Sequence, residues 1–291
     1  MKHAYAPMTP RRELLAFLML LATARPGAIG AQSPAPSMPS PRDSALPTLF
    51  HIGDSTVRNG SGNGANGQWG WGDLTACYFD TTRMNVVNRA LGGRSSRTYL
   101  TQGQWDRVLA MLKPGDVVLM QFGHNDGGAL NDTSRARGSI RGIGDESEEI
   151  DNLLTHQHEV VHSFGWYLRK FITDTKARGA TPVVASLVPR NRWENGAVQR
   201  NTKDYAGWAE AVARAEGVAF LDLNALIARE YDALGEETVM PFFVADRTHT
   251  TLAGAKLSAR VVIAALKGLP ENPVGAYLSP STLCPYSAAP R

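Results

Sequence analysis

Short apolar runs alternate along the chain with longer stretches of helical period. Several runs are continuous, such as Val117-Val118-Leu119-Met120, as expected for strands that helices cover on both faces. We predict strands at Thr48–Ile52, Asn85–Asn88, Asp116–Phe122, Thr181–Leu187 and Val218–Leu221. We predict helices at Gly72–Phe79, Gln104–Leu112, Val160–Arg178, Tyr205–Glu216, Leu223–Leu234 and Leu252–Leu266. This alternation predicts a doubly wound α/β domain around a five-stranded parallel sheet.

The first 46 residues differ from this pattern. Residues 1–31 combine a basic start ending in Arg12, an apolar run and small residues near Ala31, which is typical of a cleaved export signal. Its apolar run is about half of the roughly 20 residues that a spanning helix needs, so no membrane anchor is expected after cleavage. Residues 32–46 are rich in Pro and Ser and predict a flexible spacer. We therefore expect a secreted or periplasmic protein with one domain at 47–291.

The composition of the 291 residues, 43% hydrophobic and 20% charged, is that of an ordinary globular protein. The net charge of +3 comes from residues 1–31, and the remaining chain is formally neutral, which gives no support to a nucleic-acid-binding surface. Cys77 and Cys284 are the two cysteines. They either form a disulfide in an oxidising compartment or remain two buried thiols.

Two polar blocks supply candidate catalytic side chains. Gly53-Asp54-Ser55 directly follows the first predicted strand, where a serine is either a nucleophile at a strand-to-helix turn or a helix cap. In Asp246-Arg247-Thr248-His249 the spacing allows the carboxylate to hold one imidazole nitrogen while the other faces a nucleophile. The alternative is a capped helix start with a surface histidine.

Two further blocks supply candidate donors for a developing negative charge. Gly92-Gly93 follows the second predicted strand and either exposes backbone amides or makes an ordinary turn. Gly123-His124-Asn125-Asp126 follows the third, where the Asn125 amide either donates to an anion or forms an Asx turn. All of these blocks belong to the carboxyl ends of strands, where open α/β sheets bind ligands.

Taken together, the blocks resemble those of the SGNH, or GDSL, hydrolases, and the sequence around them is similar to rhamnogalacturonan acetylesterases. The likeness covers about residues 48 to 267 and includes Val87–Ser95, Phe122–Leu130, Pro189–Glu194 and Thr248–Ala255. It implies a three-layer α/β/α sandwich of the flavodoxin-like SGNH type. It also implies a carbohydrate esterase that removes acetyl groups from a plant cell-wall polysaccharide, rhamnogalacturonan, without a metal or other cofactor.

Carried over residue by residue, the resemblance implies that Ser55 attacks the ester, His249 takes its proton and Asp246 orients the imidazole. The oxyanion hole would consist of the backbone amides of Ser55 and Gly93 and the side chain of Asn125.

Binding of an acidic, acetylated oligo- or polysaccharide should require cations and aromatic rings near this site. The candidates are His124, Arg94, Trp193 and His162, with Trp69, Trp71, Arg190 and Arg192 in the same predicted loops. For Trp71 the alternative is a place in the core, and for the last two arginines a solvated loop.

His158-Glu159-Val160-Val161-His162 matches the zinc-peptidase pattern, but a longer metalloprotease form needs a third histidine where this chain has Leu168. Otherwise these residues begin an amphipathic helix with His162 at the edge of its buried stripe. The sequence is also compatible with a lipase, lysophospholipase or thioesterase of the same family and with a non-catalytic carbohydrate-binding relative.

Overall fold

The computed structural model describes Met1 and residues 38–279, and the domain is formed by residues 38–279. Except for Met1, the predicted export signal lies outside the described residues, as does Cys284, so the choice between a disulfide with Cys77 and two free thiols also falls outside them. Within the described part of the chain, no helix is both long and apolar enough to cross a bilayer.

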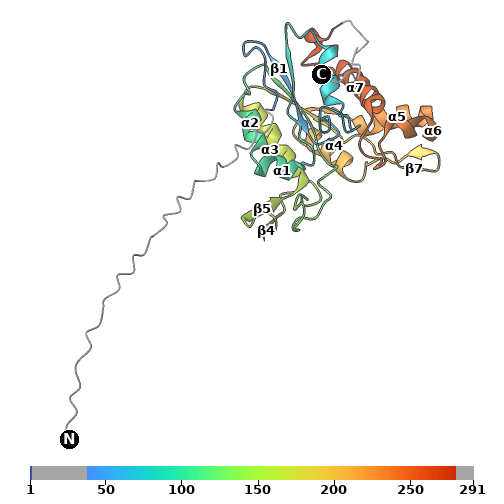
Figure 1. Cartoon of the computed structure of the whole chain (residues 1–291). Coiled ribbons are helices and arrows are strands. Elements are labelled where there is room, and N and C mark those ends of the chain that lie inside the picture. The colour runs from blue at the N-terminus through green and yellow to red at the C-terminus, as the bar shows by residue number, and fades with distance from the viewer. Residues whose placement is uncertain (2–37, 280–291) are drawn as a thin grey trace. The chain divides into compact units, whose positions relative to one another are not determined.

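A parallel five-stranded sheet forms the centre of the domain (Figure 1). Its strands are β1 (Thr48–Gly53), β2 (Asn85–Asn88), β3 (Val117–Gln121), β6 (Thr181–Ala185) and β9 (Ala219–Leu221). The order β2-β1-β3-β6-β9 is the flavodoxin-like doubly wound order, with its switch point between β1 and β3. The predicted sheet and fold class are therefore confirmed.

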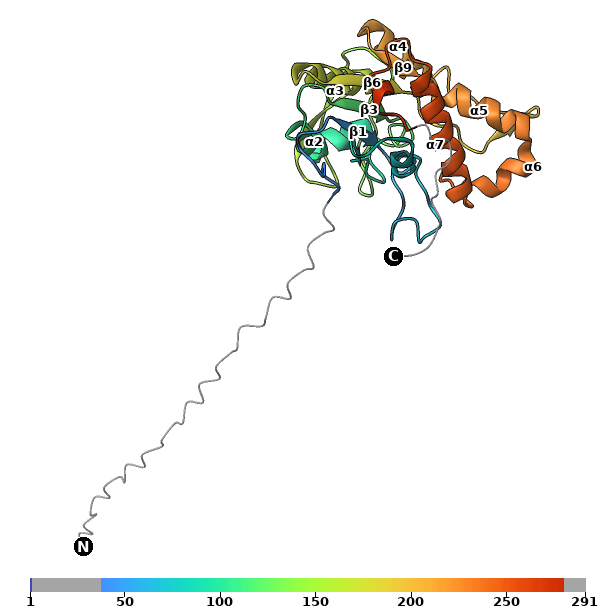
Figure 2. The same cartoon turned by 90° about the horizontal axis from the view of Figure 1, so that it is seen from above.

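Helices cover both faces of this sheet. They are α1 (Ser96–Thr101), α2 (Gln104–Leu109), α3 (Phe164–Ala177), α4 (Tyr205–Ala215), α5 (Leu223–Leu234), α6 (Glu236–Val239) and α7 (Leu252–Lys267). Alternate strand residues join different cores: Val118 and Met120 pack with α1–α4, whereas Val117 and Leu119 pack with α5 and α7. Figure 2 shows the strands between α2 and α3 on one side and α5 and α7 on the other.

Two predicted helices differ in the structure. Gly72–Phe79 contains two short 3₁₀ turns, η1 (Gly72–Leu74) and η2 (Ala76–Tyr78). Further 3₁₀ turns are η3 (Met240–Phe242) and η4 (Gly275–Tyr277). The helix predicted from Val160 begins only at Phe164, because Ser163 caps it by accepting a hydrogen bond from the Trp166 amide.

Residues before that cap form an antiparallel hairpin of β4 (Ser147–Asp151) and β5 (His158–His162). Val160 is 41% exposed, so it does not belong to a buried helical stripe as predicted. A second small hairpin pairs β7 (Trp193–Glu194) with β8 (Ala197–Val198). Periodicity did not predict either hairpin, because strands that are largely polar lack the apolar run of a sheet core.

The described part of the Pro/Ser-rich spacer is bound to the domain. The backbone amide of Arg42 donates to Asn85 Oδ1 at 3.2 Å, and Arg89 Nη1 donates to the carbonyl of Pro39 at 2.9 Å. Lys113 Nζ donates to the carbonyl of Leu46 at 2.7 Å. The compact unit therefore begins at Met38, ahead of the boundary expected at residue 47.

Candidate active site

The first polar block forms a tight turn at the carboxyl end of β1. Gly53 ends the strand, and a Cβ there would lie 2.5 Å from the carbonyl oxygen of Gln121, so only glycine allows β1 and β3 to approach this closely. The Val57 amide closes the turn by donating to the carbonyl of Asp54 at 3.2 Å. The turn buries the Asp54 side chain and leaves Ser55 partly exposed.

Ser55, His249 and Asp246 form one hydrogen-bonded chain. Ser55 Oγ lies 2.7 Å from His249 Nε2, and His249 Nδ1 lies 2.5 Å from Asp246 Oδ2. The other Asp246 oxygen accepts from the backbone amides of Thr248 and His249 at 2.8 and 2.9 Å. Burial raises the pKa of Asp246, but the hydrogen bonds from His249 and Thr248 outweigh it and lower the pKa. The carboxylate therefore stays ionised beside the imidazole.

The loop that carries His249 is held from two sides. Thr250 pairs with Trp69: the Trp69 amide donates to the Thr250 carbonyl at 2.8 Å, and Thr250 Oγ1 donates back to the Trp69 carbonyl at 2.6 Å. On the other side, Arg190 donates to Thr248 Oγ1 at 2.8 Å and to the carbonyl of His124 at 3.3 Å. Arg190 thus ties the loop after β6 to two of the polar blocks, which is a positioning contact that the sequence did not reveal.

The second and third blocks lie beside the serine. A Cβ on Gly92 would be 3.7 Å from the Cβ of Ser55, and Gly93 has a φ of +77°, which favours glycine. Asn125 is 8% exposed, and its Nδ2 donates to the carbonyl of Arg94 at 2.8 Å. An amide nitrogen carries two hydrogens, so this contact fixes the side chain and leaves a second N–H to donate.

A buried polar chain supports the nucleophile turn from below. Trp71 Nε1 donates to Gln121 Oε1 at 2.9 Å, and Gln121 Nε2 donates to Thr56 Oγ1 at 2.7 Å. Thr56 donates in turn to Asp54 Oδ1 from both its hydroxyl and its backbone amide, each at 2.8 Å. Trp71 is 1% exposed and belongs to the core. No motif indicated Gln121, although a polar residue that closes the apolar run of β3 is a usable signal.

Two substrate-binding candidates adjoin the catalytic loop and the glycine turn. Burial, together with the charges of Arg190 and His249, lowers the pKa of His124 to about 3, so this imidazole is neutral. Arg94 Nη1 lies 3.4 Å from the carbonyl of Gly92, and burial lowers the pKa of its guanidinium.

The remaining two candidates are held by different contacts. Trp193 lies in β7 and donates from Nε1 to Asn191 Oδ1 at 2.7 Å. His162 stacks on Trp166 with ring centroids 3.8 Å apart, and its backbone amide donates to the Tyr167 hydroxyl at 3.1 Å. His162 is therefore engaged with α3, and none of these contacts brings it to Ser55.

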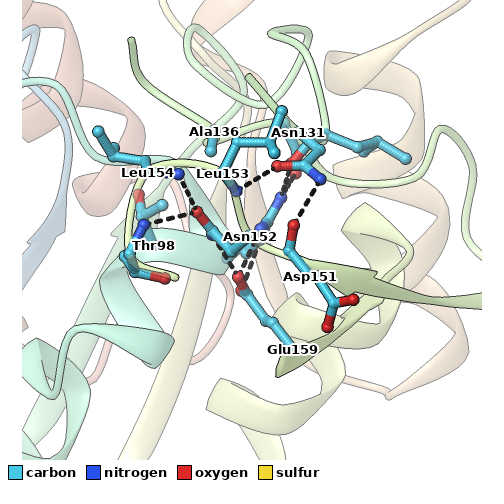
Figure 3. Close-up of polar contacts among 12 residues, drawn as sticks. Thr98, Asn131, Ala136, Asp151, Asn152, Leu153, Leu154 and Glu159 are labelled. Atoms are coloured by element: carbon cyan, nitrogen blue, oxygen red, sulfur yellow. Dashed lines mark hydrogen bonds and ion pairs between the residues drawn. The ribbon is translucent and has the colours of Figure 1, made fainter. Parts of the chain in front are cut away.

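The zinc-peptidase pattern does not form the metal-binding helix that it requires. His158 and His162 are the two ends of β5, where four residues span roughly 13 Å instead of one helical turn. Glu159 pairs with Arg97 through two hydrogen bonds of 2.7 and 2.6 Å and accepts a third from Asn152 at 2.8 Å (Figure 3). Among the described residues no group of three or more metal-ligating side chains is present. The glutamate has a structural role, and the zinc-peptidase interpretation is wrong.

The fold and this site define the class of the protein. Residues 51–257 match the model of the GDSL-like Lipase/Acylhydrolase family, and the chain belongs to this family and is an esterase. It is 33% identical over 219 residues to the rhamnogalacturonan acetylesterase of Emericella nidulans, covering 75% of this chain and 84% of that protein. It is 29% identical over 229 residues to YesY of Bacillus subtilis, a probable rhamnogalacturonan acetylesterase, covering 76% and 94%.

Solved structures show the same architecture. The protein YxiM of Bacillus subtilis matches with a TM-score of 0.61 and 26% identity over 76% of this chain and 56% of that one. A mutant of an acetyl-xylooligosaccharide esterase from Geobacillus matches with a TM-score of 0.50 and 19% identity over 77% and 95%. The latter likeness concerns the fold alone.

Proposed function

We propose that this chain is a secreted carbohydrate esterase that removes acetyl groups from rhamnogalacturonan. The observation that carries the proposal is the hydrogen-bonded chain from Ser55 through His249 to Asp246. The names of the relatives in Emericella nidulans and Bacillus subtilis support rhamnogalacturonan as the substrate. The export pattern at residues 1–31 supports secretion.

Each residue has a defined role in the proposed reaction. Ser55 Oγ forms a bond to the acetyl carbonyl carbon while its proton passes to His249 Nε2, which is 2.7 Å away. The charge on the carbonyl oxygen is stabilised by the backbone amides of Ser55 and Gly93 and by the free N–H of Asn125. Asp246 keeps Nδ1 protonated and stabilises the imidazolium that forms.

The second half of the reaction regenerates the serine. The bond between the acetyl carbonyl carbon and the sugar oxygen breaks, its electron pair stays on that oxygen, and the oxygen takes the proton of His249 and leaves as a free sugar hydroxyl, while the acetyl group stays on Ser55. Water then gives its proton to His249 and adds to the acetyl carbon, and the serine departs with that proton. Acetate is released and all atoms are accounted for, with the enzyme's own imidazole as the proton carrier throughout.

Acetate release from a panel of acetylated polysaccharides, among them rhamnogalacturonan and xylan, tests this proposal. Wild type should release acetate most efficiently from rhamnogalacturonan, and Ser55→Ala should release none. Ser61→Ala, which replaces an exposed serine, is the matched control and should retain wild-type activity. Preference for long-chain acyl esters would favour a lipase, and sugar binding without turnover would favour a binding protein. Either result would refute the proposal.

A further inference from the structure

A cavity lies beside the loop that follows Asn125. Its volume is about 510 Å³, within the usual range of ligand pockets, and it lies between the loop after β3, the hairpin of β4 and β5, and the start of α4. The side chains and backbone that matter for its chemistry belong to Asp126, Gly127, Ser139, Arg141, Glu148 and Tyr205. The catalytic steps described above use none of these residues.

Hydrogen bonds hold the loop that lines this cavity beside the proposed oxyanion donors. Asn125 directly precedes Asp126, whose Oδ1 accepts from the Ser96 amide at 3.0 Å and whose Oδ2 accepts from the Gly123 amide at 3.0 Å. Arg137 Nη1 also donates to the carbonyl of Gly93 at 2.9 Å and so connects the loop to the other proposed oxyanion donor. The loop that lines the cavity is therefore connected to both the Gly93 turn and Asn125.

Arg141 supplies an unpaired cation to the cavity. Its guanidinium lies 5.3 Å from the ring centroid of Trp208 and 6.0 Å from that of Tyr205, which holds it by cation–π contacts. Among the described residues, no side-chain hydrogen bond or ion pair of Arg141 accompanies these cation–π contacts. By contrast, the guanidinium groups of Arg97 and Arg137 donate hydrogen bonds to backbone carbonyl oxygens. All five N–H groups of Arg141 are free to bind an anion in a fixed plane.

Tyr205 gives an independent indication of a ligand. The residue is 6% exposed, and its buried hydroxyl has no hydrogen-bond partner within the described residues. This oxygen lies 3.5 Å from the place that a Cβ on Gly127 would take, so it faces a glycine that also lines the cavity. Buried hydroxyls normally have a partner, and a polar ligand group would provide one at this position.

We propose that this cavity binds the carboxylate of a uronic acid residue of the acetylated polysaccharide. The Arg141 guanidinium would pair with the carboxylate, and Tyr205 and Ser139 would contact the sugar hydroxyls. Glu148 also lines the cavity and opposes an anion, so Arg141 and Glu148 have opposite effects on its affinity. This inference rests on the proposed function and adds a second site for acidic sugars to the one predicted at Arg94.

Three variants test the assignment with acetylated acidic oligosaccharides and with neutral 4-nitrophenyl acetate. Arg141→Gln should raise KM for the acidic substrate about 10-fold, the lower range for a hydrogen bond to a charged group, and leave the neutral ester within about 2-fold. Glu148→Gln should lower KM for the acidic substrate. Arg229→Gln removes an equal charge from an exposed position on α5 and should behave as wild type. Added salt should reduce the effect of Arg141→Gln.

Failure of this inference is distinguishable from failure of the proposed function. If wild type hydrolyses acetylated pectin fragments and Arg141→Gln matches Arg229→Gln, the uronate site is refuted and the esterase proposal stands. If wild type hydrolyses no acetylated polysaccharide, unacetylated galacturonate oligomers remain as a probe. These oligomers should inhibit 4-nitrophenyl acetate hydrolysis by wild type and by Arg229→Gln. Their inhibition constant for Arg141→Gln should be about 10-fold higher. Equal inhibition of all three proteins refutes the site.

Discussion

Replacing Glu159 tests whether the β4–β5 hairpin depends on one buried ion pair. The Arg97 side chain is fully buried, and that of Glu159 is 16% exposed. Arg97 directs two donors to this carboxylate and two contacts to the carbonyls of Leu130 and Gly138. Glu159→Ala therefore leaves two donors of a buried cation without an acceptor.

The magnitude follows from the burial of both partners. Breaking a buried pair by removing one partner costs about 3–5 kcal/mol of the free energy of unfolding. Water can reach the exposed edge of the Glu159 site, so we expect the lower end, about 3 kcal/mol. Glu159→Gln keeps one acceptor oxygen and should cost roughly half as much. Glu149→Ala, on the opposite strand with a side chain 75% exposed, is the matched control and should change stability by less than about 0.5 kcal/mol.

Urea unfolding measures the global effect, and hydrogen exchange of the amides paired between β4 and β5 detects local opening of the hairpin. Burial raises the pKa of Glu159, but the hydrogen bonds from Arg97 and Asn152 outweigh it and lower the pKa. A lowered pKa in the folded state means that this stabilisation is present above the unfolded value of about 4.3 and is lost as the pH falls through the folded value. The difference between wild type and Glu159→Ala should therefore shrink below about pH 4.

Esterase activity separates this structural role from a catalytic one. Under conditions where Glu159→Ala remains folded, its hydrolysis of 4-nitrophenyl acetate should match that of Glu149→Ala. If Glu159→Ala is no less stable than Glu149→Ala by both measurements, the assignment of a buried ion pair is refuted.

Three further predictions concern the catalytic centre. Asn125→Ala should lower kcat about 10²- to 10³-fold with little change in KM, because it removes one proposed oxyanion donor; an unchanged kcat would exclude Asn125 from that role. Burial raises the pKa of Asp54 to about 6, so its ionisation opposes folding, and stability is lost as the pH rises from about 4 to about 6. Asp54→Asn lacks this dependence and should gain stability relative to wild type over that interval, as measured by urea unfolding at both limits. Arg94→Ala should weaken hydrolysis of acidic acetylated oligosaccharides more than that of a neutral acetyl ester, and equal losses would remove Arg94 from charge recognition.

Sequence patterns predicted the sheet well because its strands are short apolar runs. Asn85–Asn88 has the predicted bounds, and the other strands differ at their ends by one or two residues. The helix Leu223–Leu234 was also predicted at its observed bounds. In these elements local periodicity and burial agree, so each segment carries enough information to define its own conformation.

The hairpin shows where this agreement ends. Val160 and Val161 continue the helical spacing of Phe164 and Leu168, yet they belong to β5. The strand pairs with polar β4, and Glu159 reaches Arg97, which lies 62 positions earlier in the chain. No local pattern encodes that partner, so sequence alone favoured an amphipathic helix and left a zinc-binding helix as the alternative.

By itself, the sequence determined the alternation of strands and helices and the placement of polar blocks at strand ends, because both depend on neighbouring residues. Tertiary structure decided which blocks meet. Ser55 and His249 are 194 positions apart and come together because β1 is an inner strand of the parallel sheet, between β2 and β3, and contacts with Trp69 and Arg190 hold the histidine loop over its end. Tertiary structure likewise decided that the Arg141 guanidinium contacts aromatic rings, because the fold determines which hydrogen-bond acceptors lie near it.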